Sequence, residues 1–412
     1  MPEPNGFKNL PLNKCVKQTV IDQRILLFLL TITLSIKKMK FIVSSTELLK
    51  NLSYISGVIA PNPIVPILEN FLFELDQNKL VVTASDMQTV MVAELDVNSS
   101  DVASIAIPAR LLMDTLKSLP EQPITVNLNT DTFGVEIVTS TGRFKITGEN
   151  PLDFPRPPQV NKNFNIELNS DVLAAAINNT IFATSTDDLR PAMTGVFMDI
   201  QSDHTTFVAT DGHRLIRYRR NDIQSSTDNR LILPRKALNL LKSSLPSDVV
   251  PVVTEFSSSN AFFSFGNIKL ICRLIDERYP DYDNVIPKAN PYKLIVERST
   301  FLATLKRISI FSNKTTHQIR LKMEPNELTI SAEDLDYSNE AVEKIACEFD
   351  GELLEIGFNA KFLSEMLSNL SSSTVMMELS QPNRAGLIVP TSKQDNEDIL
   401  MLVMPVMLNS YN

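Results

Sequence analysis

The chain has 412 residues, of which 43% are hydrophobic and 21% charged, and its net charge is −9 at pH 7. This composition is typical of a folded protein, and the length allows about two to four domains of roughly 100–200 residues each. An acidic chain repels nucleic acid as a whole, so any contact with nucleic acid must come from a local basic surface. Its cysteines, Cys15, Cys272 and Cys347, form no C-x-x-C pair. This spacing argues against a zinc site or a disulfide framework and favours a reduced, cytoplasmic protein.

Residues 1–38 differ from the rest because they contain the apolar run ILLFLLTITLSI, Ile25–Ile36. A membrane span takes about 20 apolar residues, so this run is too short. It has the size of a signal-peptide core, but Lys37 and Lys38 stand where a small-residue cleavage site is expected. We therefore expect residues 1–38 to be a leader or a wrongly assigned extension outside the fold, with Met39 as the true start. Export is the open alternative.

The first of three repeated units is a serine followed by apolar residues at helical spacing. Its copies are SSTELLKNLSYISGV, NSDVLAAAINNTIF and RSTFLATLKRISIF, in which Ser45, Ser170 and Ser299 are equivalent. A serine hydroxyl accepts a hydrogen bond from the free N–H groups at a helix start, so serine is a favoured N-cap. These copies predict three helices capped by their serines.

A second unit occurs as IPARLLMDTLKSLP, ILPRKALNLLKSSLP and GFNAKFLSEMLSNL. Each copy has a first leucine and a second one seven residues later, which gives the pairs Leu112 and Leu119, Leu238 and Leu245, and Leu363 and Leu370. Seven residues are about two helical turns, so we expect both leucines of a pair on one buried face. A cation stands two residues before each first leucine, at Arg110, Lys236 and Lys361. Two residues are a rotation of about 200°, which points these cations away from the buried face.

The third unit is an alternating strand that ends in an acidic turn. It occurs as KLVVTASD, TTFVATDG and ELTISAED, in which Asp86, Asp211 and Asp334 are equivalent. We expect each aspartate to accept hydrogen bonds from nearby backbone, as aspartates in turns do. Proline-bearing segments at 151–159 and 276–291 separate the groups of units. The chain is thus predicted to contain three similar α+β domains, near residues 39–158, 159–290 and 291–412.

The middle copy alone continues as Gly212-His213-Arg214-Leu215, in the stretch ATDGHRL. A feature found in one repeat of three is expected to serve binding rather than folding. The chain has no G-x-S-x-G or H-E-x-x-H motif, and with 11 glycines it has no P-loop or G-x-G-x-x-G. We expect no catalytic residue, cofactor or metal. A hydrolase that uses Asp211 and His213 remains an alternative, and so does a repeat scaffold that binds proteins but not DNA.

Five stretches, ATDGHRL, LPRKAL, RYPDY, IGFNAKFL and VMPVML, stand in this order within residues 39–412. Together with the threefold repeat they resemble the bacterial DNA polymerase III β-subunit family of sliding clamps. The resemblance implies a head-to-tail homodimeric ring whose domains have antiparallel sheets outside and two helices inside. It implies a cytoplasmic, non-catalytic protein that encircles duplex DNA without reading its sequence and confers processivity on the replicative polymerase. The implied partners are the DNA polymerase III catalytic subunit, the clamp loader, and other polymerases and repair factors that carry short hydrophobic peptides.

The resemblance also implies three sets of site residues. A peptide pocket between the second and third domains is expected to use Met193, Thr210, Gly212, His213, Arg214, Leu215, Pro280, Val285, Asn359, Phe362, Leu402, Met404, Pro405 and Val406. The helix cations expected to face DNA are Lys50, Arg110, Lys117, Arg235, Lys236, Lys242, Lys306, Arg307 and Lys361. At the ring joint, Phe144 and Ile146 of one chain are expected to pack against Ile310 and Phe311 of the other. Both apolar pairs are expected to be exposed in a single chain, which folded proteins avoid.

Some positions depart from the family pattern. Asn62 stands where the family often has an arginine on a loop that reaches DNA, so the resemblance does not carry that contact over. Asn284 and Met407 replace residues that are often basic at the pocket, and Thr316 replaces an aromatic residue of some members. The chain also continues through the tail NSYN, residues 409–412. These differences predict a changed peptide preference without specifying it.

Overall fold

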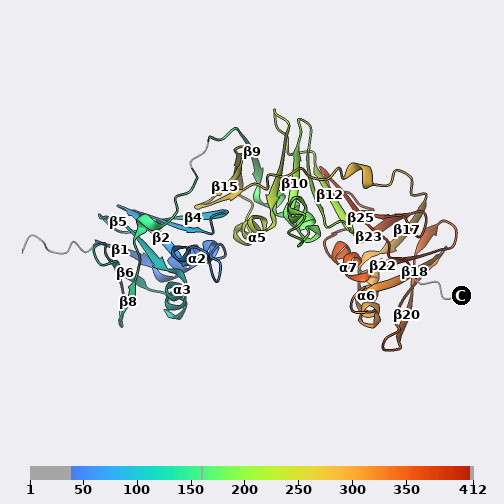
Figure 1. Cartoon of the computed structure of the whole chain (residues 1–412), viewed down its shortest axis with the longest axis horizontal. Helices are drawn as coiled ribbons and strands as arrows, with labels where there is room; N and C mark the ends of the chain where they lie inside the picture. The colour runs from blue at the N-terminus through green and yellow to red at the C-terminus, as the bar shows by residue number, and fades with distance from the viewer. Residues whose placement is uncertain (1–38, 159–160, 409–412) are drawn as a thin grey trace, which may run out of the picture. The chain divides into compact units, whose positions relative to one another are not determined.

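The computed structural model describes residues 39–158 and 161–408 (Figure 1). The expected leader and the NSYN tail lie outside the described residues. No helix within these ranges is long and apolar enough to cross a membrane.

The same order of elements occurs three times along the chain, which confirms the predicted repeat. The first copy contains β1 (Met39–Ser44), α2 (Ser45–Ser56), β2 (Asn70–Asp76), β3 (Lys79–Ser85), β4 (Thr89–Asp96), β5 (Val102–Pro108), α3 (Ala109–Ser118), β6 (Pro123–Asn129), β7 (Gly134–Val138) and β8 (Arg143–Thr147). The second copy contains β9 (Phe164–Asn169), α4 (Ser170–Thr180), β10 (Gly195–Ile200), β11 (Thr205–Thr210), β12 (Arg214–Arg220), β13 (Asn229–Pro234), α5 (Arg235–Ser244), β14 (Pro251–Phe256), β15 (Asn260–Phe265) and β16 (Ile268–Arg273). The third copy contains β17 (Tyr292–Glu297), α6 (Arg298–Ile308), β18 (Gln318–Glu324), β19 (Glu327–Asp334), β20 (Asn339–Ala346), the short β21 (Glu348–Asp350), β22 (Leu354–Asn359), α7 (Ala360–Ser368), β23 (Thr374–Leu379), β24 (Gly386–Pro390) and β25 (Glu397–Val403).

The fold packs into two compact units, one of residues 39–50, 69–82 and 95–154, and the other of 51–68, 83–94 and the described residues from 155 onward. In the first unit, β1, β6, β7 and β8 form an antiparallel sheet in that order, and β2 pairs with β5. The expected boundaries of the three domains stay a prediction.

Sheets of the second unit continue from one copy of the repeat to the next. The strands β9, β14, β15 and β16 follow one another, and β16 pairs with β4 through Ile268–Cys272 and Thr89–Ala93. The series β13, β10, β11 and β12 continues across β25 to β24, β23, β17 and β21. A further sheet has the order β20, β19, β18 and β22. Equivalent strand edges therefore join at β4–β16 and at β12–β25, whereas β8 and β20 lie at the edges of their sheets.

The second helix of each copy buries the predicted leucine face. Leu112, Leu238 and Leu363 are all buried, together with the residue one turn further on, such as Leu116 in α3. The second leucine of each pair was wrongly placed on the same helix face. Leu119 is the C-cap of α3 with extended backbone, because the helix ends at Ser118. Leu245 and Leu370 likewise follow the last residues of α5 and α7.

The prediction that the repeated serines cap their helices was wrong in position and in role. Ser45 and Ser170 are the first residues of α2 and α4, and both are buried. The Ser45 hydroxyl donates to Pro120 O over 3.0 Å and accepts from Gln122 N over 3.1 Å. Ser170 makes the same two bonds, to Asp248 O and from Val250 N. Each serine therefore holds the start of the first helix against the loop that follows the second helix.

In the third copy the residue equivalent to these serines is Arg298 and not Ser299. Arg298 is the first residue of α6, and its guanidinium donates to Ser372 O and Leu367 O near the end of α7. The helix is capped by Glu297, whose carboxylate accepts from Ser299 N at 2.9 Å and Thr300 N at 2.6 Å. Hydrogen bonds from Thr300 and Ser299 lower the pKa of Glu297 to about 2.

Candidate functional site

The stretch ATDGHRL forms the tight turn between β11 and β12. Asp211 Oδ1 accepts from His213 N over 2.9 Å and from Arg214 N over 3.0 Å. The Thr210 hydroxyl donates to Arg214 O and accepts from Gly212 N. Gly212 has a φ of +89°, a backbone conformation that side chains other than glycine rarely adopt. The predicted backbone role of Asp211 is confirmed, and Asp86 and Asp334 accept backbone N–H groups in their own turns.

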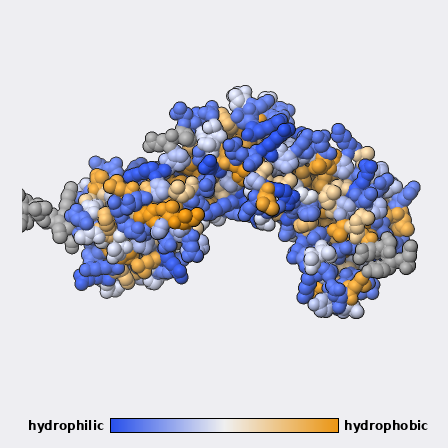
Figure 2. All heavy atoms as spheres, viewed as in Figure 1, coloured by the Kyte–Doolittle hydropathy of each residue, from blue (hydrophilic) through white to orange (hydrophobic). Residues whose placement is uncertain are grey.

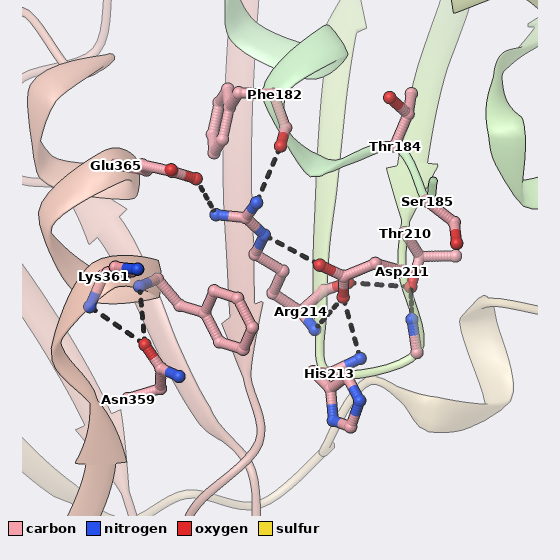
Figure 3. A network of polar contacts seen from close by, with 12 residues as sticks. Phe182, Thr184, Ser185, Thr210, Asp211, His213, Arg214, Asn359, Lys361 and Glu365 are labelled. Carbon is pink, nitrogen blue, oxygen red and sulfur yellow. Dashed lines mark hydrogen bonds and ion pairs between the residues drawn. The ribbon is translucent and has the colours of Figure 1, made fainter. Parts of the chain in front are cut away.

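Arg214 connects this turn to the α7 helix of the third copy (Figure 3). It is only 7% exposed, and its Nε lies 3.1 Å from Asp211 Oδ2. Its Nη2 donates to Phe182 O over 2.7 Å, and its Nη1 forms an ion pair with Glu365 on α7. The guanidinium carbon lies 4.6 Å from the centre of the Phe362 ring. The buried cation thus has three acceptors and an aromatic face, as a buried charge requires.

His213 lies at the surface of the same corner. Its ring stacks on Phe362 with the ring centres 6.1 Å apart, and its backbone carbonyl accepts from Met404 N over 2.8 Å. Within the described residues, no hydrogen bond joins the His213 ring to Asp211, whose carboxylate is occupied by the turn and by Arg214. The geometry therefore offers no support for a hydrolase built on Asp211 and His213.

Leu215 and Leu402 are register partners on β12 and β25 and are both buried. They belong to an apolar cluster with Phe197, Val208, Ile232, Tyr279, Ala385 and Leu387. Tyr279, from the segment after β16, stacks on Phe197 at 4.7 Å and donates to Val208 O. Burial raises the pKa of the Tyr279 hydroxyl. The second and third copies therefore share one core at this joint, to which the segment around Tyr279 also contributes.

The chain after β25 runs beside this core. Met404 is 42% exposed, and Val406 N donates to Gly357 O over 2.8 Å. A Cβ at Gly357 would lie 2.4 Å from Val406 O, so only glycine lets the two backbones approach this closely. Pro405 is partly buried, while Met407 is exposed. Met404 is thus the large apolar side chain that this segment presents to solvent next to His213.

The remaining expected pocket residues lie on neighbouring loops and helix starts. Asn359 caps α7 by accepting from Lys361 N and Phe362 N, and it donates to Thr316 O over 3.1 Å. Val285 is exposed in the short 3-10 helix Asp283–Val285, and Pro280 is partly buried. Asn284 donates to Asp281, so its side chain is held within that helical turn. Met193, in the 3-10 helix Pro191–Thr194, is partly buried.

Sequence reasoning missed several residues that shape this corner. Phe182 and Glu365 hold Arg214, although they stand far from ATDGHRL in the sequence. Arg190 is also missed: a Cβ on Gly212 would lie 2.9 Å from its Nη1, and its Nε is paired with Asp187. No local motif signals these partners, because the fold alone brings them together.

The helix cations differ in what they contact. Lys50, Arg110, Lys117, Lys242, Lys306 and Lys361 are exposed and form no ion pair with described residues, whereas Arg235 is partly buried. Arg307 forms a two-pronged ion pair with Glu343, at 2.9 and 2.6 Å. Lys236 donates to Val58 O and forms an ion pair with Asp86. Lys236 and Arg307 are therefore not free cations in this structure.

The apolar residues expected at a ring joint are only partly exposed. Ile310, Phe311 and Phe144 reach the surface, but Ile146 is 5% exposed and its expected exposure was wrong. The chain after β8 then pairs with β5 through a bridge between Glu149 and Ala106. Figure 2 shows hydrophobic residues reaching the viewed face in separate patches between hydrophilic ones.

A chain with three copies of one α+β unit, joined by continuous antiparallel strand pairs, belongs to a narrow class of folds. Family models of the DNA polymerase III beta subunit match the chain in three parts: the N-terminal domain at residues 39–158, the central domain at 167–281 and the C-terminal domain at 283–406. The chain belongs to this family.

Relatives and solved structures agree with this assignment. The beta sliding clamp of Vibrio cholerae is 27% identical over 372 residues, covering 90% of this chain and 100% of the relative. That of Proteus mirabilis is 30% identical over 345 residues, covering 83% and 93%. The DnaN sliding clamp of Pseudomonas aeruginosa bound to griselimycin has a TM-score of 0.85 at 27% identity, covering 90% of this chain and 100% of that one. The Bartonella birtlesii clamp has a TM-score of 0.84 at 28% identity, with the same coverage.

Proposed function

We propose that two copies of this chain close a head-to-tail ring around duplex DNA and act as a sliding clamp. The observation that carries the proposal is that the same pair of edge strands joins each copy of the repeat to the next. Two joints inside the chain, β4–β16 and β12–β25, pair equivalent edges of successive copies, and β20 and β8 are the next such edges. A third joint of the same kind pairs β20 of one chain with β8 of a second chain. A head-to-tail contact that closes forms a ring and leaves no strand edge of this kind open.

The ring serves DNA replication as a processivity factor without chemistry of its own. It is composed of three domains per chain, at residues 39–158, 159–290 and 291–412, and works in the cytoplasm. The order of elements and the three domain matches of the family support this division. The occupation of Asp211 by its own turn and by Arg214 supports a non-catalytic role.

The ring holds DNA through helix cations that contact phosphates. Lys50, Lys117, Lys242, Lys306 and Lys361 are the best candidates because they are exposed and unpaired among the described residues. Phosphate contacts carry no sequence information, which suits a protein that slides. Lys236 and Arg307 contribute less, since each is already bound to a carboxylate.

Partner proteins bind with short hydrophobic peptides at the corner of His213, Phe362 and Met404. Among these partners are the DNA polymerase III catalytic subunit, the clamp loader, other polymerases and repair factors. Support comes from the exposed Met404 and His213, beside a core that both copies of the repeat share. Methionine side chains adapt readily to different apolar partners.

The ring is tested by loading the full chain onto circular and linear duplexes of equal length. A closed ring stays on the circle and leaves the linear duplex through its ends. Changing Ile310 and Phe311 to alanine is expected to yield monomers that sediment as such and do not stay on circles. Equal retention on both duplexes would contradict the proposal.

The pocket is tested by calorimetry with a hydrophobic clamp-binding peptide. Met404→Ala is expected to weaken binding by about 2 kcal/mol, the size typical of a hot-spot truncation. His213→Gln keeps a polar side chain of similar reach and is expected to have a much smaller effect. Leu215→Ala is a poor probe because Leu215 is buried in the shared core. Unchanged binding by Met404→Ala, with loss by His213→Gln, would refute this pocket.

A further inference from the structure

The joint between β4 and β16 has an ion pair beside its paired strands. Lys236, near the start of α5, donates to Val58 O over 3.1 Å and pairs with Asp86 in the turn before β4. Asp86 Oδ1 also accepts backbone N–H groups of its own turn, at Gln88 and Thr89. The acidic turn of one copy is thus bound to the second helix of the next copy.

Both members of this pair have equivalents in the other copies. Asp86 is equivalent to Asp211 and Asp334, since Asp86 and Asp211 directly follow β3 and β11 and Asp334 is the last residue of β19. Lys236 is equivalent to Arg110 and Lys361, at the second residue of α3 and α7. A joint between successive copies therefore brings together an acidic turn and the second residue of a helix.

The joint between β12 and β25 also has an ion pair between the turn and the second helix, but the signs of the two charges are exchanged (Figure 3). Asp211 is bound to Arg214 of its own turn, and Arg214 pairs with Glu365 on α7. The turn now supplies the cation and the helix supplies the acid. Lys361 consequently makes no ion pair with any described residue.

The third acidic turn and helix cation, Asp334 and Arg110, form no ion pair with any residue that the structure describes. Asp334 is 4% exposed and accepts from Asp336 N, and no described cation pairs with it. A carboxylate this deeply buried is costly unless a cation or hydrogen bonds compensate it. Arg110 is exposed and likewise has no ion pair in the described chain. Their chain neighbours Leu335 and Leu111 are 55% and 53% exposed, as expected of surfaces that another protein covers.

We propose that Arg110 of one chain forms an ion pair with Asp334 of a second copy, next to the β8–β20 joint. The pair repeats between chains the contact that Lys236 and Asp86 make within the chain. It rests on the proposed ring, and it gives Arg110 a role in closing the ring rather than in holding DNA. The partner is the second copy because it alone supplies both the equivalent turn and the equivalent helix.

A double-mutant cycle on the full chain tests the pair. The dissociation constant of the dimer is measured by sedimentation for the wild type, Arg110→Gln, Asp334→Asn and the double variant. Coupling of close interfacial charges makes a roughly tenfold loss per pair reasonable. A ring with two joints loses two pairs, so each single variant is expected to dissociate about 100-fold more readily. The double variant is expected to be no weaker than the weaker single variant. Lys79→Gln, an exposed cation outside the proposed contacts, is the control and should leave the dimer unchanged.

Each other outcome contradicts the pair in a recognisable way. Additive losses, or no loss in Arg110→Gln, mean that the two residues do not meet. Reduced retention on circular DNA by Arg110→Gln with an unchanged dimer assigns Arg110 to phosphate instead. If Asp334→Asn does not fold, Arg110→Glu replaces it, and this variant must weaken the dimer more than Arg110→Gln does. A wild-type chain that does not dimerise would refute the proposed ring itself. A wild-type dimer that is unaffected by every variant would refute only the ion pair.

Discussion

Arg214 allows the joint between the second and third copies to be tested quantitatively. Replacing it with methionine keeps the apolar stem but removes every hydrogen bond of the guanidinium. Phe182 O loses its 2.7 Å donor in a partly buried site, and an acceptor left unsatisfied away from water costs about 1–3 kcal/mol. The contact over Phe362 adds about 0.5–1 kcal/mol. The pair with Glu365, whose side chain is half exposed, adds under about 1 kcal/mol. We therefore expect Arg214→Met to destabilise this joint by about 3 kcal/mol.

Native-state hydrogen exchange measures this effect where it occurs. A loss of about 3 kcal/mol raises the opening equilibrium roughly 100-fold, so amides of β12 and α7 are expected to exchange about 100-fold faster. Arg190→Met is the matched control at the same corner, because Arg190 is half exposed and pairs with Asp187 alone. It is expected to change exchange by less than about fivefold. If Glu365→Gln accelerates exchange as much as Arg214→Met, the exposed ion pair carries the joint and the reasoning from burial is wrong.

Three further predictions concern single positions. Glu297→Ala removes the α6 cap and is expected to cost about 1 kcal/mol at pH 7. Because the folded pKa of Glu297 is lowered to about 2, its contribution is present above the unfolded value and is lost as pH falls from about 4 toward 2. Denaturation of both proteins at several pH values should show the gap closing, and a constant gap would contradict this cap. Gly212→Ala is expected to lower the stability measured by melting by about 1–2 kcal/mol, because Gly212 has a φ of +89° and the new Cβ must displace Arg190. A neutral result would mean that the turn relaxes freely. Lys236→Gln is expected to lower stability by at most about 1 kcal/mol, since the Lys236 side chain is half exposed. The loss should shrink in high salt, because salt screens the ion pair with Asp86. A loss that does not depend on salt would mean that the hydrogen bond to Val58 O carries the effect.

Local signals in the sequence were sufficient for the elements and their repetition. The leucines of α3, α5 and α7 are buried as helical spacing requires, and Asp86, Asp211 and Asp334 accept backbone bonds as turn chemistry requires. The leucine spacing follows a single helix, and the aspartate bonds join residues close in sequence. Both are therefore visible in a local sequence pattern.

Contacts between distant segments left no such signal. Ser45 and Ser170 were recognised as repeated, but a serine before a helix suggests a cap, and their actual partners are loops more than 70 residues away. Ile146 has the alternation of an edge strand, yet it is buried in the single chain. Alternation and periodicity predict which face of a strand or helix carries a side chain. They do not predict which distant segment packs against that face.

The same limit explains why Gly212 to Leu215 was taken to serve binding alone. A stretch present in one copy of three was expected to lack a structural role. Arg214 has one: it supplies the link between turn and helix that Asp86 and Lys236 supply at the preceding joint, with the charges exchanged. The exchange leaves Lys361 on α7 without an ion pair among the described residues, next to Phe362, whose ring stacks on the exposed His213. The middle copy therefore differs from the others because Arg214 supplies the turn-to-helix link at its joint, with Asp211 in the turn and Glu365 on α7 as its acidic partners.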